Sequence, residues 1–358
     1  MTKTQKKLIL ILAKVVIGGG LIVFVGHRLM QDWPGVSGSI AGAFRQRPFY
    51  LVLGVIVFVG VYVLGNIRWL VLLRPHGVRL PYWAATKLWF IGHFFAQYMP
   101  GGIAGGDLIK SYYVATHREA AGRRAEAVST VFLDRFLGII GLISVLLVAV
   151  VVNLRRSSAH RQYWLMALAM LTVAIVVAVL LFSKPLLKKL PLVMRLYARL
   201  PYRDRVKRVY DAFHFYRTRP VELVVAWVLS LFVHMTTALE AYLFGLALGL
   251  GYSYLEYVLL LSVANFIASI PISPVGNVGT LETACMGVFG KAGGLPLAIL
   301  IRIAYLLWGM PGLIYFLTHR EEIPHEAVAE TVDVIEHDAE EPGDGAGQVQ
   351  PQEVPADD

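Results

Sequence analysis

Long apolar stretches separated by short basic segments dominate the pattern along this chain. An apolar run of about 18 residues or more is long enough to cross the roughly 30 Å hydrocarbon layer of a membrane as an α-helix. Runs of this kind occupy residues 8–27, 49–73, 126–152, 163–182, 221–249 and 296–317. The pattern therefore predicts an all-α polytopic membrane protein with about six full transmembrane helices.

Two further apolar segments, 84–99 and 254–270, are shorter than a full span. Each runs into a break rich in proline and glycine, and another short apolar segment follows each break. A helix, a loop at membrane depth and a second helix form a re-entrant pair, whose two ends lie on the same side of the membrane. We expect two such pairs in addition to the full spans.

The positive charges set the expected orientation, because cytoplasmic loops carry an excess of lysine and arginine. Segment 183–220 carries eleven Lys and Arg and only two acidic residues. We expect it on the cytoplasmic face as a surface helix on anionic lipid or as a plain basic connector. Loops 74–87 and 110–125 then also lie inside, whereas 153–162 lies outside despite its three arginines. Both termini are then cytoplasmic, and the two re-entrant pairs enter from opposite sides.

Composition supports a membrane domain followed by a different kind of tail. Hydrophobic residues make up 57% of the 358 residues and charged residues only 16%, against about 25% charged in average soluble domains. Residues 1–320 hold all 33 Lys and Arg, whereas 321–358 hold none and are acidic. We expect 1–320 to form the transmembrane domain and 321–358 to be a disordered solubilising tail, with partner binding as the alternative. Basic residues that flank apolar spans indicate a membrane protein of the bacterial inner membrane and no nucleic-acid partner.

The two breaks share one arrangement of residue types. The first reads AQYMPGGIAGGDLIKSYY and the second ASIPISPVGNVGTLE. In each, a proline is followed by a glycine-rich turn, then by an acidic residue, and later by a span that contains an arginine. These residues are Pro100, Gly101, Gly102, Gly105, Gly106, Asp107 and Arg135 for the first break, and Pro271, Gly276, Gly279, Glu282 and Arg302 for the second.

Charged residues and irregular backbone inside a membrane are costly and mark functional sites. Glycine lets a ligand approach the backbone, and the N-terminus of the half-helix after each turn attracts anions such as phosphate. Inverted broken helices that meet near the midplane are a known plan for transporters. The breaks therefore predict a polar cavity between two loops. The alternative is that the acidic residues only cap helices and pair with the two arginines.

Other residues in apolar surroundings are candidates for chemistry. Asp134 could form a buried ion network with Arg68, or Arg68 could instead extend to the cytoplasmic interface. Glu240 and His93 are proton-relay candidates, with a satisfied core histidine as the alternative for His93. Lys110 follows the first acidic residue and could meet a phosphate at the inner interface.

Several kinds of site are excluded by what the sequence lacks. It contains no HExxH motif and no GxxxxGK[ST] loop, so we expect no metal site, no cofactor and no ATP-driven chemistry. Cys285 is the single cysteine, which rules out a disulfide within the chain and a multi-cysteine metal site.

At these residues the chain resembles the flippase-like integral membrane family, which is related to the N-terminal transmembrane domain of lysylphosphatidylglycerol synthases. The resemblance covers about residues 8–318 and rests on MPGGIAGGDLIKSYY, AEAVSTVFLDRFLGIIGL, PISPVGNVGTLE and LIRIAYLLW. It implies that the site consists of Pro100, Gly101, Gly105, Gly106, Asp107, Asp134, Arg135, Pro271, Pro274, Gly276, Gly279, Glu282 and Arg302. Asn277 stands where the family usually has glycine. The aminoacyl-transferase domain of the synthases is missing, so we do not expect lipid aminoacylation by this chain.

The sequence thus predicts translocation of an anionic or polyprenyl-linked lipid between leaflets of the inner membrane, with membrane lipids as its partners. Arg135 and Arg302 would hold phosphate, and Asp107 and Glu282 would order the loops. One alternative is a membrane-embedded transferase acting on a lipid phosphate, with Asp107 or Glu282 as its base. Another is a scaffold for a lipid-modifying enzyme partner. No oligomeric state is predicted.

Overall fold

The computed structural model describes residues 26–27, 30–31, 33–98, 102–154, 172, 214–269 and 276–318. The predicted spans 8–27 and 163–182, most of the basic segment 183–220 and the acidic tail 321–358 lie largely or wholly outside these residues. The chain divides into two compact units, Met1–Tyr315 and Phe316–Asp358. Every helix labelled below begins in the first unit.

Four helices of the described residues are long and apolar enough to cross a membrane. They are α2 (Pro48–Leu73), α5 (Arg124–Leu154), α10 (Pro220–Leu248) and α13 (Lys291–Thr318). Proline begins both α2 and α10, at the position where its missing N–H costs no helical hydrogen bond. Four of the six predicted spans are thereby confirmed.

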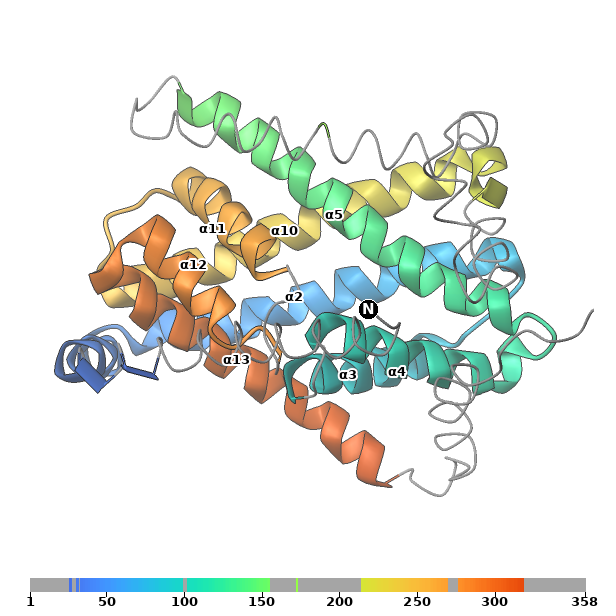
Figure 1. The fold of residues 1–358 in the computed structure, drawn as a ribbon, viewed down its shortest axis with the longest axis horizontal. Coiled ribbons are helices and arrows are strands. Elements are labelled where there is room, and N and C mark those ends of the chain that lie inside the picture. The colour runs from blue at the N-terminus through green and yellow to red at the C-terminus, as the bar shows by residue number, and fades with distance from the viewer. Residues whose placement is uncertain are drawn as a thin grey trace, which may run out of the picture. The chain divides into compact units, whose positions relative to one another are not determined.

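The first predicted re-entrant pair is a helical hairpin of α3 (Tyr82–Tyr98) and α4 (Gly102–Thr116). These helices pack side by side (Figure 1). A Cβ on Gly106 would lie 2.3 Å from the carbonyl oxygen of Gly92, so only glycine permits this approach. One turn further along α4, Lys110 packs against Trp89, one turn earlier on α3. The two helices therefore run antiparallel.

The second predicted pair consists of α11 (Tyr254–Ala268) and α12 (Thr280–Phe289), which also pack together. A capping box begins α11, because the backbone N–H of Ser253 donates to the Glu256 carboxylate at 2.8 Å. The hydroxyl of Tyr252 donates to the carbonyl of Phe289 at 3.3 Å. The end of α12 therefore lies beside the start of α11, which confirms the second hairpin.

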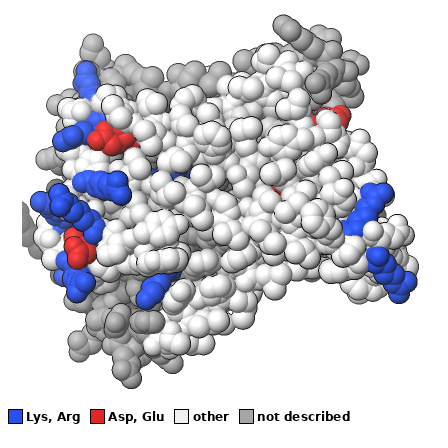
Figure 2. All heavy atoms as spheres, turned by 180° about the vertical axis from the view of Figure 1, so that it is seen from behind, with Lys and Arg blue, Asp and Glu red and all other residues white. Residues whose placement is uncertain are grey.

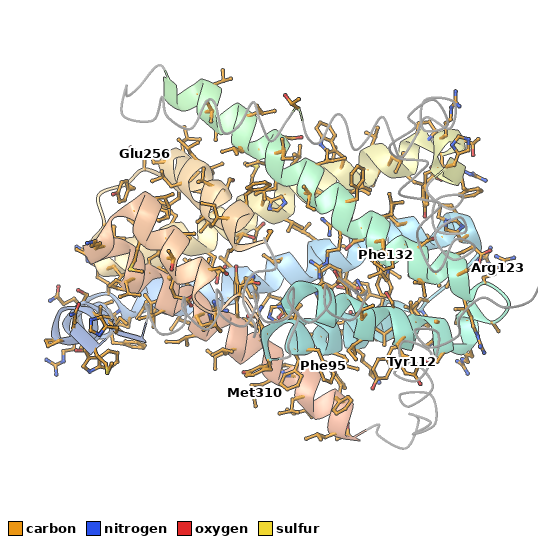
Figure 3. The ribbon with its side chains drawn as sticks, in the orientation of Figure 1. Phe95, Tyr112, Arg123, Phe132, Glu256 and Met310 are labelled. Atoms are coloured by element: carbon orange, nitrogen blue, oxygen red, sulfur yellow. The ribbon has the colours of Figure 1, made fainter. Side chains whose placement is uncertain are left out.

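The long helices link two opposite ends of this unit, and one end carries most of the basic residues that the structure describes (Figure 2). It holds three short 3₁₀ helices, η1 (Arg74–His76), η2 (Arg118–Ala120) and η4 (Tyr216–Thr218). There Arg123 donates to the carbonyl of His76 at 2.6 Å, and the Tyr216 hydroxyl donates to the carbonyl of Leu72. Figure 3 shows Arg123 at this basic end and Glu256 at the opposite end. In Figure 2, Lys and Arg gather at the two ends and the surface between them is largely uncharged, as a membrane-spanning protein requires.

The hairpins enter from opposite ends, as the sequence predicts. The α3–α4 hairpin leads through η2 into α5 at the basic end, whereas α11 and α12 begin and finish at the end where α10 stops. The largest apolar core joins α11 and α12 to α5, α10 and α13. A second core joins α3 and α4 to α2 and α5. Each hairpin thus packs into its own core.

Candidate functional site

The turns of the two hairpins touch each other. Gly102 begins α4 with a φ of +55°, and a Cβ there would lie 2.8 Å from the carbonyl oxygen of Gly276. Gly276 has a φ of +52°, and a Cβ there would lie 2.5 Å from the carbonyl oxygen of Gln97. Both positions therefore require glycine for their backbone angle and for space. Four predicted turn residues lie outside the described ranges: Pro100, Gly101, Pro271 and Pro274.

Arg302 ties the two turns together from α13. Its Nε and Nη2 donate to the two carboxylate oxygens of Glu282 at 2.9 and 3.2 Å, and Nη2 also donates to the carbonyl of Asn277 at 2.9 Å. Its Nη1 reaches across to the side-chain oxygen of Gln97 on α3 at 3.2 Å. Glu282 also accepts from the backbone N–H of Gly279 at 2.8 Å and so caps α12. All three guanidinium nitrogens of Arg302 thus have protein acceptors.

Arg135 is arranged differently, although it pairs with the acidic residue of the first break. Its Nε donates to the Asp107 carboxylate at 2.5 Å. Asp107 lies in the second turn of α4, so it does not cap that helix as Glu282 caps α12. The side chain of Arg135 is 43% exposed and that of Asp107 only 11%. Within the described part of the chain, Nε is the one guanidinium atom of Arg135 that donates a hydrogen bond.

Arg68 and Asp134 form a second, fully enclosed ion pair beside the first. Nε and Nη2 of Arg68 donate to the two carboxylate oxygens at 2.7 and 2.9 Å, and Nη1 donates to the Ser230 hydroxyl at 2.9 Å. Their side chains are 5% and 2% exposed. The prediction of a buried ion network is therefore confirmed, and the alternative in which Arg68 extends to the interface is wrong.

Lys110 lies close to both ion pairs but does not form one itself within the described residues. Its ammonium group lies 3.7 Å from the ring centroid of Trp69 and 4.0 Å from that of Trp89. Cation–π contacts of this kind hold a cation in a desolvated place. The side chain is buried and interacts electrostatically with both acidic residues of the ion pairs. Three basic and two acidic side chains give this cluster a formal charge of +1.

The cluster lies deep in the helices. Asp107 is nine residues from the end of α4, about 14 Å along the helix axis at 1.5 Å per residue, and Arg135 is eleven residues into α5, about 16 Å from the same end. Arg302 is likewise eleven residues into α13, about 16 Å from the opposite end. Half the thickness of a bilayer hydrocarbon layer is about 15 Å. Both arginines therefore lie near the middle of the span.

Arg135 opens onto an apolar surface. Phe132 and Ile139 lie three residues before it and four after it on α5, and their side chains are 41% and 45% exposed. Residues with this spacing share one face of a helix. Leu108, next to Asp107 on α4, is also exposed. Figure 3 shows Phe132 on this part of α5. The partly exposed side chain of Arg135 is thus flanked by side chains suited to lipid tails.

The remaining predicted residues have structural neighbours. His93 lies with a ring nitrogen 3.1 Å from the carbonyl oxygen of Tyr305 and packs among aromatic rings, which fits the alternative of a satisfied core histidine. Glu240 is fully buried on α10. Gly105 is half-buried beside Gly106 on α4.

Sequence reasoning missed the residues that complete these clusters. Gln97 links the two turns, Ser230 binds Arg68, and Trp69 and Trp89 enclose Lys110. Gln97 had a usable signal, because it is a polar residue at the end of an apolar half-helix. The other three are ordinary residues for apolar helices, and only their position in space reveals their role.

Comparison with known proteins agrees with this architecture. The family model described as the lysylphosphatidylglycerol synthase TM region matches residues 11–313. The chain belongs to this family. Among curated proteins and among solved structures, no significant match was found.

For a member of the lysylphosphatidylglycerol synthase TM region family, the match supports a multi-pass membrane protein with a lipid-related function. The paired breaks and the ion-pair clusters all fall within the matched residues. Among the described residues, no group of His, Cys, Asp and Glu side chains could hold a metal ion.

Proposed function

We propose that this protein moves an anionic lipid, a phospholipid or a polyprenyl-linked phosphate, between membrane leaflets. The observation that carries the proposal is the half-exposed side chain of Arg135 in a cluster of formal charge +1 near mid-span. A guanidinium binds phosphate oxygens through paired N–H donors. Such donors remain on Arg135, whereas the nitrogens of Arg302 already have protein acceptors.

The proposed path keeps the lipid tails in the membrane while the headgroup passes Arg135. Asp107 holds the guanidinium of Arg135 from the protein side. The enclosed Arg68–Asp134 pair and Lys110 lie beside it and leave the cluster with a net positive charge. The exposed apolar side chains of Phe132 and Ile139 contact the tails. This arrangement lowers the cost of bringing a phosphate to mid-span, because the headgroup finds a positive charge there.

Replacing Arg135 with glutamine is expected to slow translocation about tenfold to a hundredfold, the range given by the loss of a charge-assisted hydrogen bond. The measurement is transfer of labelled lipid in proteoliposomes, with phosphatidylglycerol, phosphatidylcholine and a polyprenyl phosphate compared. We expect the two anionic lipids, and not phosphatidylcholine, to depend on Arg135.

Arg118→Gln is the matched control, because Arg118 is an exposed arginine paired with Glu119 at the basic end. It should leave translocation unchanged. Should Arg135→Gln fold poorly, the double variant Asp107→Asn/Arg135→Gln removes both charges and keeps the comparison. Normal transfer of every lipid by a folded Arg135 variant contradicts the proposal. A new lipid species that appears with the protein, seen by mass spectrometry, would favour the transferase instead.

We also place the basic end in the cytoplasm of a bacterium, because positive charges favour that side. Tyr315 of α13 lies there too, since the ammonium group of Lys87, near the start of α3, lies 5.5 Å from the centroid of its ring. Cys285 is buried, so a new exposed cysteine can be labelled against a silent background. Arg118→Cys should react with a membrane-impermeant maleimide only after the cell is opened, and Gly251→Cys should react in intact cells once the outer membrane is permeabilised. The reverse pattern would show the opposite orientation.

A further inference from the structure

Glu240 has no role in the proposed lipid path, yet it is the most isolated carboxyl group of the described residues. It lies on α10 with 0% exposure. Neither of its side-chain oxygens has a hydrogen-bond partner, whereas Asp107, Asp134 and Glu282 all pair with arginines. A buried carboxylate without a partner is costly, and carboxyl groups in membrane spans mark proton pathways or substrate sites.

The groups around Glu240 supply no compensating positive charge. Its electrostatic neighbours are Tyr62 of α2 and Tyr305 of α13. From α5, the charged side chains Asp134 and Arg135 are already paired. The titratable groups of α11 near α10 add no positive charge either. Tyr254 donates a hydrogen bond to the carbonyl of Met235, and Tyr257 packs on Gly245 and Tyr242. Glu256 caps its own helix.

The two electrostatic neighbours of Glu240, Tyr62 and Tyr305, both pack beside the ring of His93 on the α3–α4 hairpin. The rings of Tyr62 and His93 are 5.2 Å apart, and a ring nitrogen of His93 lies 3.1 Å from the carbonyl oxygen of Tyr305. Tyr305 is three residues after Arg302 on α13, and the two interact electrostatically. A change of charge at Glu240 would therefore act on the helical turn that holds the two hairpins together.

We infer that Glu240 takes up and releases a proton during the transport cycle and so couples lipid movement to a proton gradient. The inference rests on the proposed function. The step is a simple acid–base exchange: water or hydronium delivers a proton to the carboxylate, and the carboxyl returns it to water after the conformational change. In its charged form Glu240 favours an arrangement in which water or a polar partner reaches α10. In its neutral form it favours the closed packing described above.

The experiment applies a pH difference across proteoliposomes that contain the full chain and a labelled anionic lipid. With a difference of about two units and one proton per lipid, the labelled lipid can accumulate in one leaflet by up to about 100-fold. We expect the wild type to accumulate the lipid. Glu240→Gln should equilibrate it without accumulation, because glutamine matches the shape of the neutral carboxyl but cannot exchange a proton.

Glu222→Gln is the matched control, since Glu222 lies at the first turn of the same helix and should leave accumulation intact. Lipid movement in the wild type that does not depend on the gradient, or accumulation that persists in Glu240→Gln, overturns the inference and leaves the proposed function standing.

If no lipid moves in the wild type, the proposed function fails, and infrared difference spectroscopy then tests proton exchange at Glu240 by itself. A protonated-carboxyl band that titrates and is missing in Glu240→Gln supports proton exchange, and its absence from the wild type overturns it.

Discussion

Replacing Asp134 with asparagine is expected to lower the free energy of unfolding by about 3 to 5 kcal/mol, the cost of breaking a buried ion pair. Asp134 receives two hydrogen bonds from Arg68, and both side chains are almost fully enclosed. The variant leaves the guanidinium charged and without its counter-ion. The measurement is reversible unfolding in bicelles, or steric trapping, followed with purified protein.

Two comparisons separate this effect from general sensitivity to charge. Glu119→Gln breaks the exposed pair with Arg118 and should cost less than about 1 kcal/mol. The double variant Arg68→Met/Asp134→Leu should regain most of the lost stability, because an apolar pair of similar size often replaces a buried ion pair without loss. If Asp134→Asn is as stable as the wild type, the pair is hydrated in solution and this account of it is wrong.

Arg302→Gln is expected to lower the free energy of unfolding by a similar amount, about 3 to 5 kcal/mol. Its effect should extend to both hairpins. It leaves the Glu282 carboxylate with only the N–H of Gly279 and removes the donors to Asn277 and Gln97. Hydrogen exchange should therefore speed up in both turns, around residues 97–107 and 276–282, because the same side chain holds both.

The control for this second prediction is Gln97→Leu, which removes only the link between the hairpins. A lost hydrogen bond to a charged group should cost about 1.5 to 3 kcal/mol. Faster exchange confined to 276–282 in Arg302→Gln would show that Arg302 stabilises its own hairpin alone. Faster exchange in both turns, with lipid transfer retained, would separate its structural role from the headgroup role proposed for Arg135.

Within the described residues, the sequence was sufficient for the long helices and for both hairpins. Periodicity and length predict the spans at 49–73, 126–152, 221–249 and 296–317, and the proline and glycine breaks predict both hairpins. The pairing of Asp107 with Arg135 and of Glu282 with Arg302 was the alternative to a cavity in which the arginines hold phosphate, and both pairs are observed.

The sequence could not decide which side chains meet across long separations. Arg68 is five residues from the end of α2, a distance compatible with a buried pair or with the interface, and only the position of α5 decides between them. The sequence also could not predict that Arg135 is partly exposed whereas Arg302 is enclosed, because the two arginines have similar apolar neighbours in sequence. The asymmetry between the two halves arises from packing, in which α13 contacts both turns and α5 reaches only the first acidic residue.

The contact between Gly102 and Gly276 has a consequence for exchanging parts between relatives. A side chain on Gly102 would meet the Gly276 backbone, and a side chain on Gly276 would meet the Gln97 backbone at the end of α3, so the two turns form a matched surface. A chimera that takes residues 82–116 from one family member and keeps 254–302 of another combines two hairpins whose turns do not match each other in shape. Hybrids should therefore work when both hairpins come from the same parent, whatever the origin of the spans between them.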